Sequence, residues 1–445
     1  MPEKRQIEDF APFDLSKYEA VLDRKYVKKL GVVSQAVGLA IESAGPDVAV
    51  GSACRIISAD GERTVLAEVV GFKGKSILLM PLGDMSGIGP GSAVEAGGKP
   101  MTVKVSRELL GRVLDGLGKP MDGMAELSEG FDQSIANPPP NPMLRNRIKS
   151  PLVLGIKAID GLLTIGKGQR AGIFAGSGVG KSTLMGMIAR NTRADVNVIA
   201  LIGERGREVR EFIEKDLGEE GLMRSVLVVA TSDKPALVRL KAAETATAIA
   251  EFFRDKGEDV LLLMDSLTRY AMAQREVGLA AGEPPVSRGY TPSVFAAMPK
   301  LLERAGNSDK GSITGLYTVL VDGDDMTEPV TDTSRGILDG HIVLSRKMAN
   351  RNHYPAIDVL ASISRVMTDI ISKEHKDLAN RIKKAMAVYA DAEDIISIGA
   401  YAKGSNAEID DAIEKRKKID EFLIQEISEN YSFEDTLRIM EGIIS

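Results

Sequence analysis

A glycine-rich octapeptide, residues 175–182, constrains the fold of this chain more than any other feature. It reads Ala-Gly-Ser-Gly-Val-Gly-Lys-Ser and stands between an apolar segment, 170–174, and a segment with helical spacing, 181–192. A strand, a glycine-rich turn ending in Lys-Ser and a helix together form a phosphate-binding loop. The alternative is a glycine-rich turn that merely precedes a lysine. Because a strand and a helix flank the turn, we predict the phosphate-binding loop.

The residue types in this loop suit a bound triphosphate. Glycines let consecutive backbone N–H groups turn toward one anion, and the N-terminus of the helix adds a partial positive charge. Lys181 can reach the β- and γ-phosphates, and the Ser182 hydroxyl can coordinate Mg²⁺. Ala175 replaces the usual first glycine but is small enough for the strand exit. We expect the nucleotide to be bound by Gly176, Ser177, Gly178, Val179, Gly180, Lys181, Ser182 and Thr183.

Composition narrows the class of protein. The 445 residues carry a net charge of −6, which gives no general affinity for nucleic acid. One cysteine and three histidines exclude a disulfide framework, a thiolate metal site and a histidine metal cluster. The charged N-terminus predicts no secretion signal, and no apolar run approaches the ~18 residues of a membrane span. We therefore expect a cytoplasmic protein that would need a partner to act at a membrane.

Four regions differ in their residue pattern. Residues 1–27 form a polar tail with spacing for a possible short amphipathic helix. Between 28 and 98, short alternating strands with regular turns predict a small β-barrel. Residues 99–371 are turn-rich at first and then alternate apolar strands with helices, which predicts a mostly parallel sheet in an α/β domain. Residues 372–445 show helical spacing and predict a small helical domain.

The expected elements of the α/β domain follow from its apolar runs. Strands are expected at 170–174, 196–202, 226–230, 260–264, 314–321 and 341–344, and helices at 181–192, 206–216, 235–255 and 293–305. Ligands of such sheets bind at the carboxyl ends of the strands. The loop at 175–182 stands at that edge.

Two further strands end near carboxylates. Asp265 follows an apolar run, an arrangement in which the carboxylate holds Mg²⁺ directly or through water. Glu204 follows the strand at 196–202 in a Gly-Glu-Arg turn, at the same sheet edge. A carboxylate there can orient or activate the water that attacks the γ-phosphate. A surface glutamate paired with Arg205 or Arg207 remains the alternative.

Four segments together resemble the rotary-ATPase α/β superfamily. They are the loop at 175–182, Gly-Glu-Arg at 203–205, Asp-Ser-Leu-Thr-Arg at 265–269 and Pro-Ala-Ile-Asp-Val-Leu-Ala-Ser-Ile-Ser at 355–364. Within it the chain is similar to the ATPases of type III protein export, through the segments 79–83, 282–285 and 338–341. The segments 176–179 and 288–295 look closer to the flagellar branch than to the injectisome branch. The resemblance extends from about residue 28 to the C-terminus.

The resemblance implies a RecA-like ATPase domain and a role for each matching residue. Glu204 matches the catalytic glutamate of the family, and Arg205 matches the arginine that follows it. Arg365 matches the arginine finger, which stabilises transition-state charge on the γ-phosphate held by a neighbouring subunit. Tyr354 matches the aromatic residue that packs on adenine. Tyr401 is a looser match for a second aromatic wall.

A finger that acts on a neighbour leaves a monomer with incomplete sites. The resemblance therefore implies a closed homo-oligomeric ring, six-fold in this family, whose activity rises with protein concentration. The implied function is Mg²⁺-dependent ATP hydrolysis that energises export of flagellar proteins through a type III apparatus. The alternatives are an injectisome ATPase, a catalytic subunit of a proton-driven ATP synthase and an RNA translocase.

The resemblance also implies partners and a location. The partners are a stator-like regulatory protein, a central stalk protein, export substrates with their chaperones and a membrane export gate. No nucleic acid is expected as a partner, because the net charge is negative. The chain is then expected in the cytoplasm, peripherally associated with the membrane export apparatus.

Overall fold

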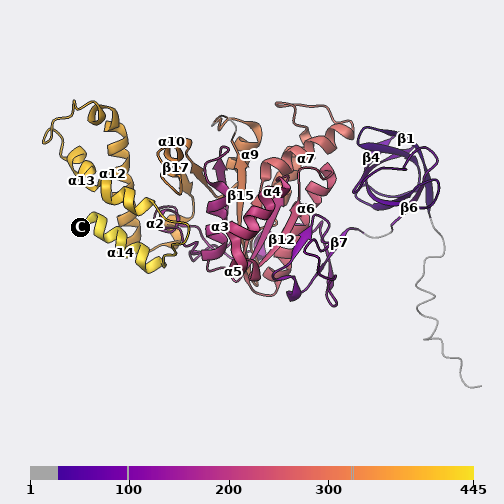
Figure 1. Cartoon of the computed structure of the whole chain (residues 1–445), viewed down its shortest axis with the longest axis horizontal. Coiled ribbons are helices and arrows are strands. Elements are labelled where there is room, and N and C mark those ends of the chain that lie inside the picture. Colours follow the sequence, from indigo (N-terminus) through magenta and orange to yellow (C-terminus); the bar gives the residue numbers. More distant parts are fainter. Residues whose placement is uncertain (1–28, 98–99, 322, 324) are drawn as a thin grey trace, which may run out of the picture. The chain divides into compact units, whose positions relative to one another are not determined.

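The computed structural model of the chain describes residues 29–97, 100–321, 323 and 325–445. These residues form two compact units, one made of 29–79 with 84–97 and the other of 80–83 with 100–445. Figure 1 shows the elements of both units. The amphipathic helix considered for the N-terminal tail lies outside the described residues.

The first unit is a closed six-stranded barrel, as its alternating pattern predicts. The strands follow the order β1-β2-β5-β4-β3-β6 around the barrel. Their inward-facing residues form a small apolar core that includes Ile41, Ile56 and Leu79. The bounds are β1 Leu30–Val37, β2 Ala40–Ala44, β3 Ala53–Ile57, β4 Thr64–Lys73, β5 Ser76–Pro81 and β6 Ala93–Ala96.

The second unit is built on a nine-stranded sheet, which confirms the predicted mostly parallel sheet. The strand order is β17-β16-β10-β15-β13-β11-β12-β8, with β14 paired to β15. All neighbours are parallel except β16 with β17 and β14 with β15. The bounds are β8 Val113–Asp115, β10 Arg170–Ala175, β11 Val196–Ile202, β12 Ser225–Ala230, β13 Asp259–Asp265, β14 Gly306–Asn307, β15 Ser312–Leu320, β16 Gly340–Leu344 and β17 Ile357–Ser364.

Helices connect and cover these strands. The long helix α6 packs against β11, β12 and β13, and α7 packs against β15. The bounds are α2 Lys157–Leu162, α3 Lys181–Asn191, α4 Gly206–Glu211, the π-helix η3 Phe212–Leu217, α5 Gly218–Met223, α6 Ala236–Asp255, α7 Leu267–Ala280, α8 Pro292–Leu302, α9 Pro329–Ile337 and α10 Arg346–Asn350. Smaller elements are η1 Arg107–Leu109, η2 Pro142–Leu144 and the antiparallel pair β7 Thr102–Val105 with β9 Phe131–Ser134.

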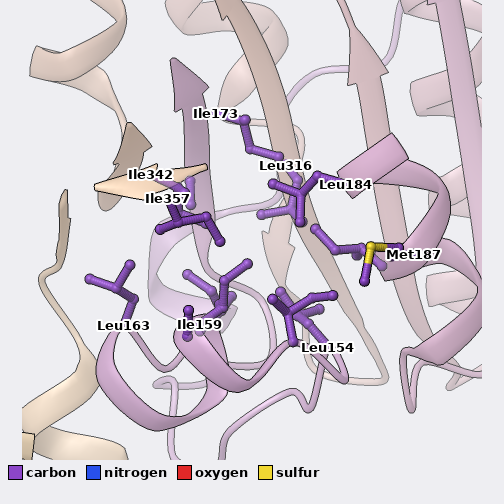
Figure 2. Packing of buried hydrophobic residues seen from close by; sticks show 14 of the residues in the cluster. Leu154, Ile159, Leu163, Ile173, Leu184, Met187, Leu316, Ile342 and Ile357 are labelled. Atoms are coloured by element: carbon purple, nitrogen blue, oxygen red, sulfur yellow. The ribbon is translucent and has the colours of Figure 1, made fainter. Parts of the chain in front are cut away.

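The C-terminal part of the chain is helical, as predicted, and shares its core with the sheet. The helices are α11 Met367–Ile370, α12 Lys373–Ser397, α13 Ala407–Leu423 and α14 Phe433–Ile444. The short helix α2 is buried between the two parts, since Gly161 lies against Met440 and Phe422 of the C-terminal helices. Ile159 of α2 belongs to the same apolar cluster as Ile173 and Leu184 (Figure 2).

Candidate active site

The carboxyl ends of three parallel strands bring the predicted polar residues together. In the order β10-β15-β13-β11, the glycine-rich loop follows β10, Asp265 ends β13 and Glu204 comes two residues after β11. The register fixes their level, because Leu201 of β11 is the partner of Asp265 in β13. Lys181, Glu204 and Asp265 therefore meet at one edge of the sheet.

The loop has the backbone that its glycines permit. Gly178 and Gly180 have φ values of +76° and +88°, in the left-handed region that favours glycine. Gly180 is the N-cap of α3, so the helix begins at Lys181. Ser182 and Thr183 lie in the first turn of α3, where backbone N–H groups are free of intrahelical partners. In the loop Gly176 and Val179 are buried, whereas Ser177 and Gly178 are exposed.

Lys181 lies between two carboxylates. Its Nζ forms an ion pair with Asp265 Oδ1 and lies 3.7 Å from Glu204 Oε1. The Asp265 side chain is only 4% exposed, and Thr318 Oγ1 of β15 donates a hydrogen bond of 2.6 Å to its Oδ1. This buried network fixes the Lys181 ammonium beside the glycine-rich loop.

Burial and charge give Glu204 an unusual acidity. Burial, the first cause, and the negative charge of Asp265 raise the pKa of Glu204 to about 7, although Lys181 acts in the opposite direction. A hydrogen bond shared with Glu208 raises the pKa of Glu204 further and lowers the pKa of Glu208. A carboxylate with a pKa near neutrality is well matched to proton exchange with a reacting water. The predicted position of Glu204 at this edge is observed.

Arg205 follows Glu204 but points into solvent. Its side chain is 78% exposed, and Nη1 lies 3.1 Å from Glu208 Oε1. Within the described residues Arg205 pairs with Glu208, and it forms no ion pair with Glu204 or Asp265. The structure therefore does not bring Arg205 to the Lys181 cluster.

Arg365 lies at the opposite end of the parallel strands, where their amino ends meet. Because β17 runs antiparallel to β16, its C-terminal end stands where the parallel strands begin. The Arg365 N–H donates to the Asp339 carbonyl at 3.0 Å, and Nη2 donates to the Arg335 carbonyl at 3.1 Å. Asp339 also accepts from the first residue of β10. Since β10 is about 17 Å long between its ends, Arg365 cannot reach the loop of its own chain.

The two predicted aromatic residues have different surroundings. The Tyr354 ring lies over the loop, because a Cβ added at Gly180 would meet its ring carbons at 3.3 and 3.4 Å. Tyr354 is 40% exposed, so part of its ring is accessible beside the loop. The Tyr401 hydroxyl lies 2.9 Å from the carbonyl oxygen of Asn406, the N-cap of α13, and 3.0 Å from Oδ1 of Asp410 in the first turns of that helix.

The oxygen ligands near the loop suit a magnesium ion that is also coordinated by a nucleotide. Ser182 and Asp265 offer one hydroxyl and one carboxylate, which are ligands that Mg²⁺ accepts together with phosphate oxygens and water. Among the described residues, no group of three or more His, Cys, Asp or Glu side chains could hold a metal alone. A magnesium ion here would be bound with the triphosphate and would neutralise its charge.

Two residues at the site were not predicted from the sequence. Thr318 could have been found, because it lies near the carboxyl end of a predicted strand, at the same edge as Asp265. Glu208 lies in the first turn of α4 and shares a hydrogen bond with Glu204, which precedes that helix.

Comparison with known proteins identifies the family. Two domains of the ATP synthase alpha/beta family match this chain: the beta-barrel domain matches residues 33–98, and the nucleotide-binding domain matches residues 155–364. The T3SS EscN ATPase C-terminal domain matches residues 371–442. The flagellum-specific ATP synthase of Bacillus subtilis is 57% identical over 94% of this chain and 95% of its own length. The type 3 secretion system ATPase of Xanthomonas euvesicatoria is 50% identical over 94% of both chains.

A solved structure agrees in fold over nearly the whole chain. The assembled ATPase EscN from the type III secretion system of enteropathogenic E. coli has a TM-score of 0.89 and 47% identity, covering 93% of this chain and all of that chain. This chain therefore belongs to the family of the flagellum-specific ATP synthases and type 3 secretion system ATPases, within the ATP synthase alpha/beta family. The resemblance inferred from its motifs is confirmed. Among the described residues, no helix is long and apolar enough to cross a membrane.

Proposed function

We propose that this chain hydrolyses Mg-ATP in a hexameric ring and thereby energises the export of flagellar proteins. Its identity as an ATPase of type III export follows from its family. The observation that supports the chemistry best is Glu204, a carboxylate with a pKa of about 7 that lies 3.7 Å from Lys181 at the phosphate-binding loop. The flagellar assignment is favoured by the 57% and 54% identity to flagellum-specific enzymes.

Each residue of the site has a proposed task. The backbone N–H groups of the loop and the Lys181 ammonium bind the β- and γ-phosphates. Ser182 and Asp265 hold the Mg²⁺ ion, which withdraws charge from the phosphates when it is bound. Glu204 orients the attacking water and accepts its proton, and its high pKa makes it a sufficient base near neutrality. Arg205 supports this turn through Glu208.

The remaining residues of the proposed site contact the adenine or come from a neighbouring subunit. Tyr354 packs on adenine, supported by its position over Gly180. Tyr401 is proposed as a second aromatic wall on family resemblance alone. Arg365 acts on the nucleotide of the neighbouring subunit, supported by its place at the far edge of the sheet.

The proposed assembly has several partners. EscN has been solved in assembled form and in complex with its central stalk EscO, which supports an oligomer with a stalk protein here. We further propose a stator-like regulator near the N-terminal tail, substrate–chaperone complexes and a membrane export gate. The chain would work in the cytoplasm, at the periphery of the export apparatus. We propose the barrel (28–98), ATPase (99–371) and helical (372–445) regions as its working domains.

Replacing Glu204 tests this proposal in the cell and in the test tube. Glu204→Gln should bind Mg-ATP as the wild type does, lose at least ~100-fold in turnover, and fail to restore motility to a deletion strain. Glu214→Gln is the control, because Glu214 is exposed on the adjacent helical segment and pairs with Arg210. Near-normal hydrolysis by Glu204→Gln would contradict the chemistry. Normal motility with lost effector secretion in the deletion strain would assign the chain to an injectisome.

A further inference from the structure

The buried side chain of one glutamine, Gln425, joins three separate parts of the ATPase unit. It follows α13 closely and is 3% exposed. Its Nε2 donates to the Gly155 carbonyl at 2.9 Å and to the Glu429 carbonyl at 3.1 Å, and its Oε1 accepts from the Lys157 N–H at 2.9 Å. The side chain thus uses both of its amide N–H groups and its oxygen in hydrogen bonds to the protein.

These bonds fix the connection between α13 and α14, residues 424–432, onto the core of the ATPase unit. Gly155 and Lys157 lie at the start of α2, whose Asp160 carboxylate accepts from the N–H groups of Leu154 and Gly155 at 2.9 and 2.7 Å. Two hydrogen bonds therefore hold the backbone before α2 to the Asp160 carboxylate. Gln425 attaches the C-terminal connection to the same segment.

The same connection is also attached to the helix that carries the phosphate-binding lysine. Arg190 Nη2 donates to the Ile427 carbonyl at 2.9 Å, and Asn191 Nδ2 donates to the Glu429 carbonyl at 3.3 Å. Both side chains belong to the last turn of α3, which begins at Lys181. The 424–432 connection thus spans α2 and the end of α3.

The backbone of Gln425 makes the functional contact. Its N–H donates to the Tyr354 carbonyl at 3.0 Å, and the Tyr354 ring lies over Gly180 of the loop. A displacement of α13 that moves residue 425 must therefore either carry Tyr354 with it or break this hydrogen bond. One residue links the C-terminal helices to the aromatic ring beside the nucleotide.

We propose that Gln425 is a positioning residue that holds Tyr354 against the nucleotide base and couples nucleotide affinity to the position of the C-terminal helices. This inference rests on the proposed ATPase function and on Tyr354 as its base-binding residue. A partner that displaces α13 or α14 would then change the affinity for the base. The affinity for the phosphates, which the loop and Lys181 bind, would be retained.

Isosteric removal of the Gln425 hydrogen bonds tests the proposal with two ligands. In Gln425→Met we expect the Kd for ATP to rise about five- to tenfold, because the aromatic contact loosens. The Kd for inorganic tripolyphosphate, which has no base, should change less than about twofold. Gln274→Met is the matched control, since Gln274 makes a single side-chain hydrogen bond to Ser293 in the same unit. It should leave both affinities unchanged.

Tyr354→Ala provides the coupling test. If Gln425 acts through Tyr354, the double variant Gln425→Met with Tyr354→Ala should bind ATP no more weakly than Tyr354→Ala alone. Additive losses would overturn the proposal. So would equal losses for ATP and tripolyphosphate, which indicate general damage to the site.

A milder variant covers the case in which Gln425→Met does not fold. Arg190→Ala releases the same connection at its more exposed side, and it should show the same preference, a weaker affinity for ATP but not for tripolyphosphate. Unchanged ATP affinity in both variants, with wild-type protein that binds and hydrolyses ATP, would overturn this inference only. A wild-type protein that fails to hydrolyse ATP would instead contradict the proposed function.

Discussion

At the scale of single residues, the proposed chemistry depends on the environment of Glu204. Its carboxylate is buried beside Asp265, and both effects raise its pKa to about 7, while the nearby Lys181 ammonium lowers it. Together these surroundings hold the pKa of the Glu204 carboxyl well above its ordinary value. We therefore expect the activity to depend on pH and on the neighbours of Glu204.

The first prediction concerns the pH dependence. In the proposed mechanism the ionised form of Glu204 accepts the proton of the attacking water, so kcat/KM should rise with pH through about 7 in the free enzyme. Glu208→Gln should move this acid limb to lower pH, since the hydrogen bond and charge of Glu208 raise the pKa of Glu204. Steady-state kinetics over roughly pH 5–9 give the profile. An unmoved limb, or one moved to higher pH, would contradict this account of Glu204.

The second prediction concerns Lys181. Lys181→Ala removes the cation between Glu204 and Asp265, so two uncompensated carboxylates would face the triphosphate. We expect ATP to bind at least ~10-fold more weakly, as is usual for a lost charge-assisted hydrogen bond. Titration calorimetry measures it, with the exposed Lys215→Ala as control. Unchanged affinity and turnover would refute the phosphate-binding loop.

At the scale of elements, α3 depends on close packing against η3. A Cβ at Gly186, in the middle of α3, would meet the carbonyl oxygen and Cβ of Asp216 at 2.5 and 2.6 Å. The helix that begins at Lys181 can therefore approach its neighbour only because this position is glycine. Displacement of α3 would also displace the loop.

The third prediction follows from this contact. Gly186→Ala should lower the free energy of unfolding by about 1–3 kcal/mol, the usual cost of overpacking, and should weaken nucleotide binding. Gly442→Ala is the matched control, because nothing lies within 4 Å of a Cβ at this helical position. That change should be neutral or stabilising by up to ~1 kcal/mol. Denaturant unfolding compares the two, and equal stability would show that α3 tolerates the added methyl group.

The same elements show what the sequence could predict. The strands of the parallel core are long apolar runs, so β10, β11, β12, β13, β15 and β16 were expected within one or two residues. The edge strands β8 and β17 were not expected. The three-residue β8 lies among glycine turns and pairs with β12, distant in the sequence. In β17, buried and exposed residues alternate irregularly, so its pattern does not distinguish it from a loop.

Some features of the site could likewise be predicted from the sequence, and others could not. Lys181, Glu204 and Asp265 could be placed together because parallel strands share one carboxyl edge. The contact of Gln425 with Tyr354 joins residues 71 positions apart through a backbone hydrogen bond, and no local pattern encodes it. The protonation of Glu204 also depends on tertiary burial, which the sequence does not show.

At the scale of the whole molecule, the two halves of the proposed site lie on opposite edges of one sheet. Lys181 follows β10 at the carboxyl edge, and Arg365 follows β17 at the other edge. Within one chain they cannot meet. A closed ring of identical copies, each placing its Arg365 against the loop of the next, would complete every site. Each nucleotide site would then be shared between two neighbouring subunits.

The ATPase activity of mixed rings shows whether a site is shared between subunits. Lys181→Ala and Arg365→Ala should each be inactive alone, because every site in such a ring lacks one half. In rings assembled from equal amounts of both, about a quarter of the sites pair an intact Lys181 with an intact Arg365, so about a quarter of the wild-type ATPase activity should return. Rings shown by native mass spectrometry to be mixed, yet as inactive as either variant alone, would contradict a site shared between subunits.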